Sequence, residues 1–361
     1  MKDRALANGN DTRTISSIAA TGFGLTALCI ADRRGYRPSG ELANRARATL
    51  VFLLDRLPHK KGFFHHFIDM NTGARAFNSE VSSIDTAILM CGILTCRQHF
   101  GDAQIRSLAT QLYGRVDWMW MLNSGATLSH GWRPETGFIS FRWDAYSEHM
   151  MLYLLAIGSP THPIPASSWN AWSRPMVQFQ GLRYIAVAAP LFIHQYSHAW
   201  IDFRSKRDAH ADYFENSVTA TQAHKQFCLS LRGQFPHYSD DLWGITASDS
   251  VKGYVVWGGP PAIGPIDGTV IPAAAAGSLP FLFDDTVRVL RTIRSRYPRA
   301  WSRYGFVDAF NPQTNWYNPD VIGIDQGISL LMAENARSGF VWTTFMGNPE
   351  ISAAMRAVGF H

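Results

Sequence analysis

Two segments decide the fold: ISSIAATGFGLTALCIADR, residues 15–33, and PSGELANRARATLVFLLDRL, residues 38–57. Both carry apolar residues at helical spacing, and the second places Leu42, Ala46 and Leu50 on one face. Only a short turn separates them, so the two helices are expected to pack side by side in opposite directions.

The same periodicity recurs along most of the chain. It predicts further helices over residues 79–100, 104–121, 146–157, 190–203, 216–235, 279–297, 324–338 and 349–358, with a short helix around Trp169 and Trp172. Residues 59–78 break the pattern and are typical of a small β-hairpin that turns at residues 71–73. Residues 236–276 are rich in Gly and Pro and predict a long, functional loop.

An all-α fold follows, in which paired helices form a ring with the long loops and the hairpin gathered at one end. The chain has 361 residues, which is long for one ordinary core, yet no linker divides it. A ring of helical hairpins accommodates this length as a single domain spanning residues 1–361. Hydrophobic residues make up 46% and charged residues 17%, so a large core is expected and disorder is not.

Composition narrows the function. Aromatic residues reach 13%, with 12 Trp, and flat apolar faces with a polar edge suit sugar rings as well as a core. The net charge is +5 with scattered Lys and Arg, so no nucleic-acid surface is predicted. We find no apolar run of 18 residues, no signal peptide at Met1 and no phosphate-binding glycine motif, which argues against a membrane span and a nucleotide cofactor. The four cysteines lie in apolar helical stretches and are expected to be buried free thiols.

Glycoside cleavage needs two carboxyl groups, one to protonate the leaving oxygen and one to attack or to activate water. Glu148 is the best candidate for the acid, because it follows Trp143, Asp144 and Tyr146 and precedes an apolar helix. A carboxyl in such surroundings is desolvated, which raises its pKa toward that of a general acid. The alternative is an ordinary Glu in a first helical turn.

Two further acids stand at predicted helix starts. Glu80 opens the helix in NSEVSSIDTAILM, and Asp325 opens the one in GIDQGISLLMAEN. Asp85 lies among apolar residues, where a hydrogen-bonding role is favoured over catalysis. A calcium-loop template beginning at Asp69 fails because Ala74 occupies the place that requires Gly.

Two polar and aromatic stretches, HQYSHAWIDFR (194–204) and WGITASDSVKGYVVW (243–257), predict sugar-binding walls. His194 and His198 have the spacing of a zinc pair but lack a third ligand, so no metal site is predicted and a hydrogen-bonded pair in a cleft is preferred. The predicted substrate-binding residues are Arg142, Trp143, Tyr146, His194, Gln195, Trp200, Asp202, Arg204, Trp243, Asp249, Tyr254, Trp257 and Asp308.

Several long motifs, ISSIAATGFGLTAL, SEVSSIDTAIL, RWDAYSEHMMLYLLAIGSPTHP, QYSHAWIDFR and YNPDVIGIDQG, resemble the bacterial glycoamylase-like family. That family includes endo-β-1,2-glucanases and the transglycosylase domain of cyclic β-1,2-glucan synthases. The resemblance spans residues 4–360 and implies an (α/α)6 barrel that acts on glucan, best supported as β-1,2-glucan, in a periplasmic or secreted setting.

Carried over by position, the resemblance places the essential acids on Glu80 and Glu148, with a third on Asp325. We therefore expect a glycoside hydrolase or transglycosylase with Glu148 as general acid, Glu80 as nucleophile or base, and Asp325 as the alternative base. An α-glucan glucoamylase and a non-catalytic oligosaccharide-binding protein on the same fold remain as alternatives. Neither the stereochemistry of cleavage nor the oligomeric state follows from the sequence.

Overall fold

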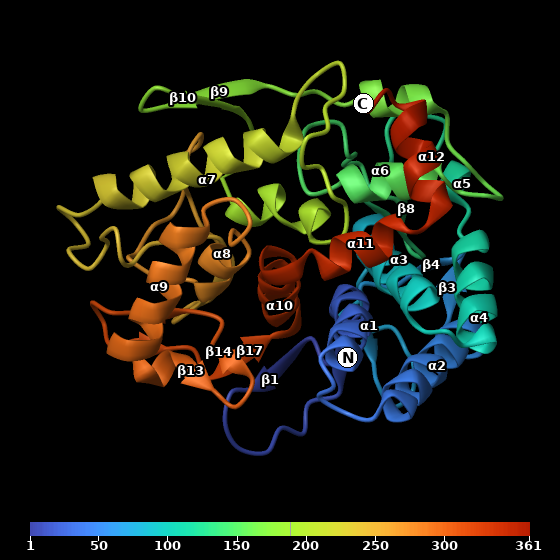
Figure 1. Cartoon of the computed structure of the whole chain (residues 1–361), viewed down its shortest axis with the longest axis horizontal. Coiled ribbons are helices and arrows are strands. Elements are labelled where there is room, and N and C mark those ends of the chain that lie inside the picture. Colours follow the sequence, from blue (N-terminus) through green and yellow to red (C-terminus); the bar gives the residue numbers. More distant parts are fainter. Residues whose placement is uncertain (188) are drawn as a thin grey trace.

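The computed structural model describes residues 1–187 and 189–361, and most of its regular structure is helical (Figure 1). The α-helices are α1 (Ile18–Arg33), α2 (Ser39–Asp55), α3 (Ser83–His99), α4 (Ala103–Gly114), α5 (Trp118–Leu122), α6 (Met150–Ile157), α7 (Tyr213–Ser230), α8 (Pro272–Ala276), α9 (Phe283–Arg296), α10 (Gly323–Ser338), α11 (Phe340–Met346) and α12 (Pro349–Ala357). Short 3-10 helices are η1 (Ala166–Asn170), η2 (Leu191–His194), η3 (Tyr196–Ala199) and η4 (Pro298–Ala300).

Short strands lie between the helices. They are β1 (Arg4–Leu6), β2 (Ile15–Ser17), β3 (His59–Lys60), β4 (Phe63–Phe64), β5 (Phe67–Asp69), β6 (Val81–Ser82), β7 (Gly131–Arg133), β8 (Gly137–Phe138), β9 (Met176–Phe179), β10 (Leu182–Ile185), β11 (Ala247–Ser250), β12 (Gly253–Val256), β13 (Trp301–Ser302), β14 (Gly305–Phe306), β15 (Phe310–Asn311), β16 (Trp316–Tyr317) and β17 (Asp320–Ile322). All named pairs are antiparallel, and three of them join distant segments: β1 with β17, β2 with β5, and β6 with β7.

Most predicted helices are present, with differences that have physical causes. The predicted helix over 104–121 is broken into α4 and α5, and Asp117 caps the second of them by accepting a hydrogen bond from the Trp120 N–H. Residues 190–203 form η2 and η3 rather than one α-helix, because their backbone closes tighter turns. The region 236–276, predicted as a loop, holds the hairpin β11–β12 and the short helix α8.

The segment predicted as one hairpin, 59–78, divides into two parts. β3 and β4 pair with each other, whereas β5 pairs with β2 just before α1. Across the expected turn, Ile68 and Arg75 form an antiparallel bridge, which is flanked by backbone hydrogen bonds from Asp69 to Ala74 at 2.8 Å and from Ala76 to Phe67 at 2.9 Å.

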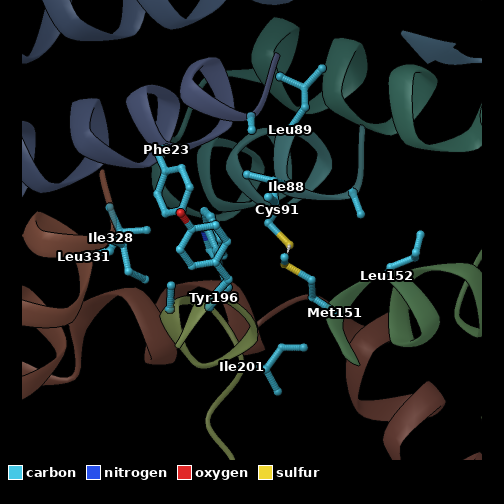
Figure 2. Packing of buried hydrophobic residues seen from close by; sticks show 14 of the residues in the cluster. Phe23, Ile88, Leu89, Cys91, Met151, Leu152, Tyr196, Ile201, Ile328 and Leu331 are labelled. Atoms are coloured by element: carbon cyan, nitrogen blue, oxygen red, sulfur yellow. Dashed lines mark hydrogen bonds between the residues drawn. The ribbon is translucent and has the colours of Figure 1, made fainter. Parts of the chain in front are cut away.

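The core is shared by helices that are distant in sequence. Helix α1 packs against α3 and α10, and α3 also contacts α6 (Figure 1). Figure 2 shows Phe23 of α1 and Tyr196 of η3 directed at one another, with ring centroids 5.6 Å apart. In the same view Cys91 of α3 meets Met151 of α6, with the two sulfur atoms 4.0 Å apart. The four cysteines are buried and free, as predicted.

Helices α1 and α3 cross at two glycines. A Cβ atom on Gly92 would stand 2.1 Å from the carbonyl oxygen of Gly22, and one on Gly22 would stand 2.3 Å from that of Ile88. Neither backbone can yield, so the crossing accepts only glycine at both positions. Within the described residues no helix is both long and apolar enough to cross a lipid bilayer.

We expect Gly92→Ala to lower the free energy of unfolding by about 2 kcal/mol, because the overpacked crossing outweighs the gain in helix propensity. Gly40 in α2 is the matched control, because nothing lies within 4 Å of its added Cβ. Gly40→Ala should leave stability unchanged or raise it by up to about 1 kcal/mol. Urea unfolding of both variants measures the difference, and equal shifts in the two would contradict the tight crossing.

Candidate active site

A cavity of about 610 Å³ lies where the N-terminal ends of several helices meet. Its wall contains residues from the first turns of α1, α3, α8 and α10, and Glu148, which immediately precedes the N-cap of α6. Helix N-termini carry partial positive charge and stabilise nearby carboxylates. The polar and charged residues that line the cavity are Asp3, Arg4, Arg13, Ser17, His66, Asp85, Glu148, Gln195, Tyr196, Thr246, Tyr254 and Asp325.

Asp85 and Asp325 occupy the same place in their helices, the third residue after the N-cap. Asp85 also completes a reciprocal cap with Ser82, whose hydroxyl donates to the carboxylate at 2.5 Å and accepts from the Asp85 N–H at 3.2 Å. The predicted hydrogen-bonding role of Asp85 is thus present. The sequence did not anticipate that the same side chain lines the cavity.

Glu148 is partly buried at the cavity wall. Burial raises the pKa of its carboxyl, the nearby charge of Asp85 adds to the effect, and a hydrogen bond from the Ser147 hydroxyl only partly opposes it. The backbone is held as well, since the Ser197 hydroxyl donates to the Glu148 carbonyl at 2.5 Å. The result is a fixed carboxyl whose pKa lies above its ordinary value.

Asp325 lies opposite a second acid in the interior. That acid is Asp308, whose Oδ2 accepts from the Asp249 N–H at 2.9 Å and from Asn318 Nδ2 at 2.8 Å. Burial, followed by the adjacent Asp308 carboxyl, raises the pKa of Asp325 well above its usual range. Burial also raises the pKa of Asp308, so both carboxyl groups resist ionisation more than an exposed aspartate does.

Glu80 is separated from the cavity by a histidine, His66. His66 lines the cavity, and its ring lies between two acids, with Nδ1 3.2 Å from Glu80 and Nε2 3.5 Å from Asp85. Burial alone would lower the pKa of His66, but Asp85 and Glu80 outweigh it and raise the pKa to about 9. The hydrogen bond from His66 lowers the pKa of Glu80 to about 2. Glu80 itself does not line the cavity.

An ionic network closes the side of the cavity formed by the N-terminal segment. Arg4 donates to Asp249 at 2.7 Å, and Arg13 donates to Asp320 at 2.7 and 2.8 Å. These bonds tie β1, β11 and β17 together, so the N-terminal segment becomes part of the wall.

The structure brings four of the predicted site residues to the cavity: Glu148, Asp325, Gln195 and Tyr254. The predicted indoles Trp143, Trp200, Trp243 and Trp257 do not line it and are buried instead. Three of their indole N–H groups donate to hydroxyls within the protein: Trp143 to Ser83, Trp200 to Thr26, and Trp257 to Ser248. Here the high Trp content reflects the core more than the cavity.

Five other predicted substrate-binding residues also form contacts within the protein and do not line the cavity. Arg142 donates to the backbone of Leu122 and Thr127, and Asp202 pairs with Arg204, whose guanidinium lies 4.1 Å from the ring centroid of Trp342. Asp249 accepts from Arg4, and Asp308 accepts from Asn318. Neither acid lines the cavity.

The expected pairing of His194 with His198 is wrong. His194 Nδ1 lies 3.1 Å from the Tyr146 hydroxyl, and His198 Nε2 lies 3.1 Å from the Ser217 hydroxyl. Burial lowers the pKa of each histidine to about 3, so both rings are neutral. Tyr146 and His194 are thus core residues rather than substrate contacts.

Sequence reasoning missed His66, Phe67, Phe77 and the N-terminal arginines, all of which line the cavity. The HHF run at 65–67 between apolar residues was the available signal for the first two. The arginines could not be found this way, because long-range contacts bring them to the site: β1 pairs with β17 at Arg4, and Arg13 bonds to Asp320 of β17.

One group among the described residues has metal-binding side chains close together: His66, Glu80 and Asp85, with ligand atoms within 4.8 Å of one another. Both ring nitrogens of His66 already face a carboxylate, and the ring is cationic at neutral pH. These features fit an ion triad rather than a metal site.

Comparison with known proteins shows the family to which the chain belongs. A family model described as putative glucoamylase matches residues 140–349, more than half of the length. The chain belongs to this glycoamylase family.

Several proteins that are similar to this chain have names that give β-1,2-glucans as their substrates. An exo-β-1,2-glucooligosaccharide sophorohydrolase from Parabacteroides distasonis is 28% identical over 94% of the chain, which spans about half (52%) of that relative's length. The solved endo-β-1,2-glucanase of Chitinophaga pinensis, a complex with sophorotriose and glucose, is 28% identical with a TM-score of 0.93, covering 100% of this chain and 92% of the other. A Talaromyces funiculosus endo-β-1,2-glucanase shares the fold at 11% identity and a TM-score of 0.67, with 98% and 83% covered.

The raised pKa of His66 predicts a pH dependence of stability. Its contribution is fully present below about pH 6.5, the ordinary pKa of histidine, and is lost as the pH rises through about 9. The difference in unfolding free energy between the wild type and His66→Gln should thus be largest near pH 6 and small near pH 10. NMR titration of the imidazoles offers an internal comparison, because burial lowers the pKa of His59. Titration of His66 below pH 7 would contradict the ion triad.

Proposed function

We propose that this protein is a glycoside hydrolase that cleaves β-1,2-linked glucan in the cavity described above. The observation that carries the proposal is that two acids distant in sequence, Glu148 just before α6 and Asp325 in the first turn of α10, both line one cavity. The names of the relatives support the β-1,2 linkage. Two carboxyl groups are the minimum that glycoside cleavage requires.

Glu148 is the proposed general acid. Its raised pKa favours the protonated form that a general acid needs, and its proton passes to the leaving glycosidic oxygen as the bond to the anomeric carbon breaks. The Ser147 hydroxyl and the bond from Ser197 to the Glu148 backbone hold the group in place.

Asp325, with Asp308 behind it, is the proposed proton acceptor. In this proposal the two carboxyl groups share one proton, and the pair takes a second from the attacking water: Asp325 accepts it while passing its own to Asp308. Bonds from the Asp249 N–H and Asn318 keep Asp308 oriented for this exchange.

Glu80 takes a different role from the one the sequence suggested. It lies behind His66, so we assign it to positioning: it keeps His66 charged, and His66 in turn holds Asp85 at the wall beside Glu148. Asp325, rather than Glu80, is then the base that acts together with Glu148.

We further propose that the helices form one (α/α)6 barrel domain over residues 1–361. The contacts of α1 with α3 and α10, of α3 with α6, and of α8 with α10 support an inner ring, and α2, α4 and α9 flank it. An inner ring explains why so many N-terminal ends line one cavity.

Glu148→Gln should lower kcat on β-1,2-glucan by about 10³-fold or more, because the amide cannot donate the acid's proton. Binding of β-1,2-gluco-oligosaccharide, measured by calorimetry, should persist. The matched control is Glu41→Gln, an exposed Glu in the first turn of α2, which should keep full activity. Full activity of Glu148→Gln would overturn the assignment. A parallel screen with α-glucans and other β-glucans tests the linkage.

Asp325→Asn should likewise lower kcat by about 10²-fold or more. Asp284→Asn, at an exposed first-turn position of α9, is its control and should have no effect. NMR of the first-formed product then assigns the step. An inverted anomer fits water activation by the Asp325–Asp308 pair, whereas a retained anomer, or transfer to a sugar acceptor, requires a covalent intermediate and contradicts that role.

A further inference from the structure

The turn at residues 76–79 holds a large side chain in an unfavourable backbone conformation. Phe77 and Asn78 both have positive φ, 55° and 49°, and the Ser79 N–H donates to the Ala76 carbonyl at 3.0 Å. A tight turn with two left-handed central residues prefers Asn and Gly, because a Cβ atom is crowded there. Asn78 fits this preference, whereas Phe77 does not.

The surrounding structure holds this turn firmly. The guanidinium of Arg75 donates to the carbonyl oxygens of Asn78 at 2.6 Å and Ser79 at 2.5 Å. The Ser79 hydroxyl accepts from the Phe67 N–H at 3.1 Å and donates to the Phe67 carbonyl at 3.2 Å. Strained residues persist where neighbours fix them in this way, and they concentrate at functional sites.

The ring of Phe77 gains no burial in return. It is 73% exposed, yet it lines the cavity, so it lies at the opening. Its neighbour Phe67 meets it edge to face at 5.6 Å and stacks on His66 at 3.9 Å between centroids. A row of rings thus runs from the His66 ion triad to the opening, where Tyr254 of β12, 55% exposed, also lines the cavity.

We propose that Phe77 is a specificity-determining residue, a rigid platform that stacks on a glucosyl unit at the cavity opening, beyond the units at the acids. This proposal rests on the proposed function, since it takes a β-1,2-gluco-oligosaccharide as the ligand. The apolar face of a pyranose ring suits an exposed phenyl ring whose backbone is already held in place before binding. The platform selects for chains long enough to reach it.

The test compares Phe77→Ala with Phe141→Ala, a control whose ring is 69% exposed but does not line the cavity. KM and kcat are measured on linear β-1,2-gluco-oligosaccharides of increasing length. Phe77→Ala should raise KM about tenfold for chains that reach the opening, with kcat unchanged, and should leave the shortest substrate unaffected. Phe77→Trp should restore the wild-type KM.

A second variant separates the ring from the backbone. Phe77→Gly should lose the same affinity as Phe77→Ala but raise Tm by about 1–3 °C, because glycine relieves the positive φ. Equal KM values for Phe77→Ala and Phe141→Ala at every chain length, with an active wild type, would overturn the platform alone. If the wild type neither binds nor cleaves any β-1,2-gluco-oligosaccharide, the proposed function fails and the platform with it.

Discussion

The contact between Gly22 of α1 and Gly92 of α3 is the constraint on which the site depends. Two helices whose backbones touch cannot slide or rotate independently, so the first turns of α1 and α3 are fixed relative to each other. Ser17 and Asp85 consequently face the same cavity. Helix α10 extends the arrangement through its contacts with α1, and Gly327 allows it to pack closely on Phe23.

Convergence of helix ends creates an electrostatic conflict that the chain resolves in three ways. Several carboxyl groups are drawn to the partially positive ends, yet burial and mutual repulsion oppose their ionisation. Burial raises the pKa of Glu148, burial and the adjacent Asp308 raise the pKa of Asp325, and a charged His66 lowers the pKa of Glu80. Different pKa values among neighbouring carboxyl groups are what separates an acid from a base at a single pH.

The sequence predicted most helices and two of the acids that line the cavity, Glu148 and Asp325, because both follow from local patterns. Apolar periodicity marks the helices, and Glu148 and Asp325 stand at helix starts, a feature visible within about ten residues. The substrate-binding predictions fared worse, because Trp243 and Trp257 near polar residues look the same in sequence whether they face a sugar or a core. Only the long-range packing decides, and here it buries both. Arg4 and Arg13 were missed for the related reason that contacts across more than 300 residues place them, strand pairing for Arg4 and an ion pair with Asp320 for Arg13.

Helix ends carry the acids, whereas a turn and a hairpin form the opening, and this separation affects how specificity for substrate length can change. The acids sit on helix ends that are fixed by the core, so altering their positions would disturb packing between α1, α3 and α10. The opening, in contrast, is formed by the turn at 76–79 and the hairpin β11–β12, which contribute Phe77 and Tyr254. Side chains there are largely exposed, so substitutions cost little stability. Substrate length can therefore be adjusted at the opening while the chemistry stays with the helix ends, which is consistent with exo- and endo-acting enzymes among the proteins similar to this chain.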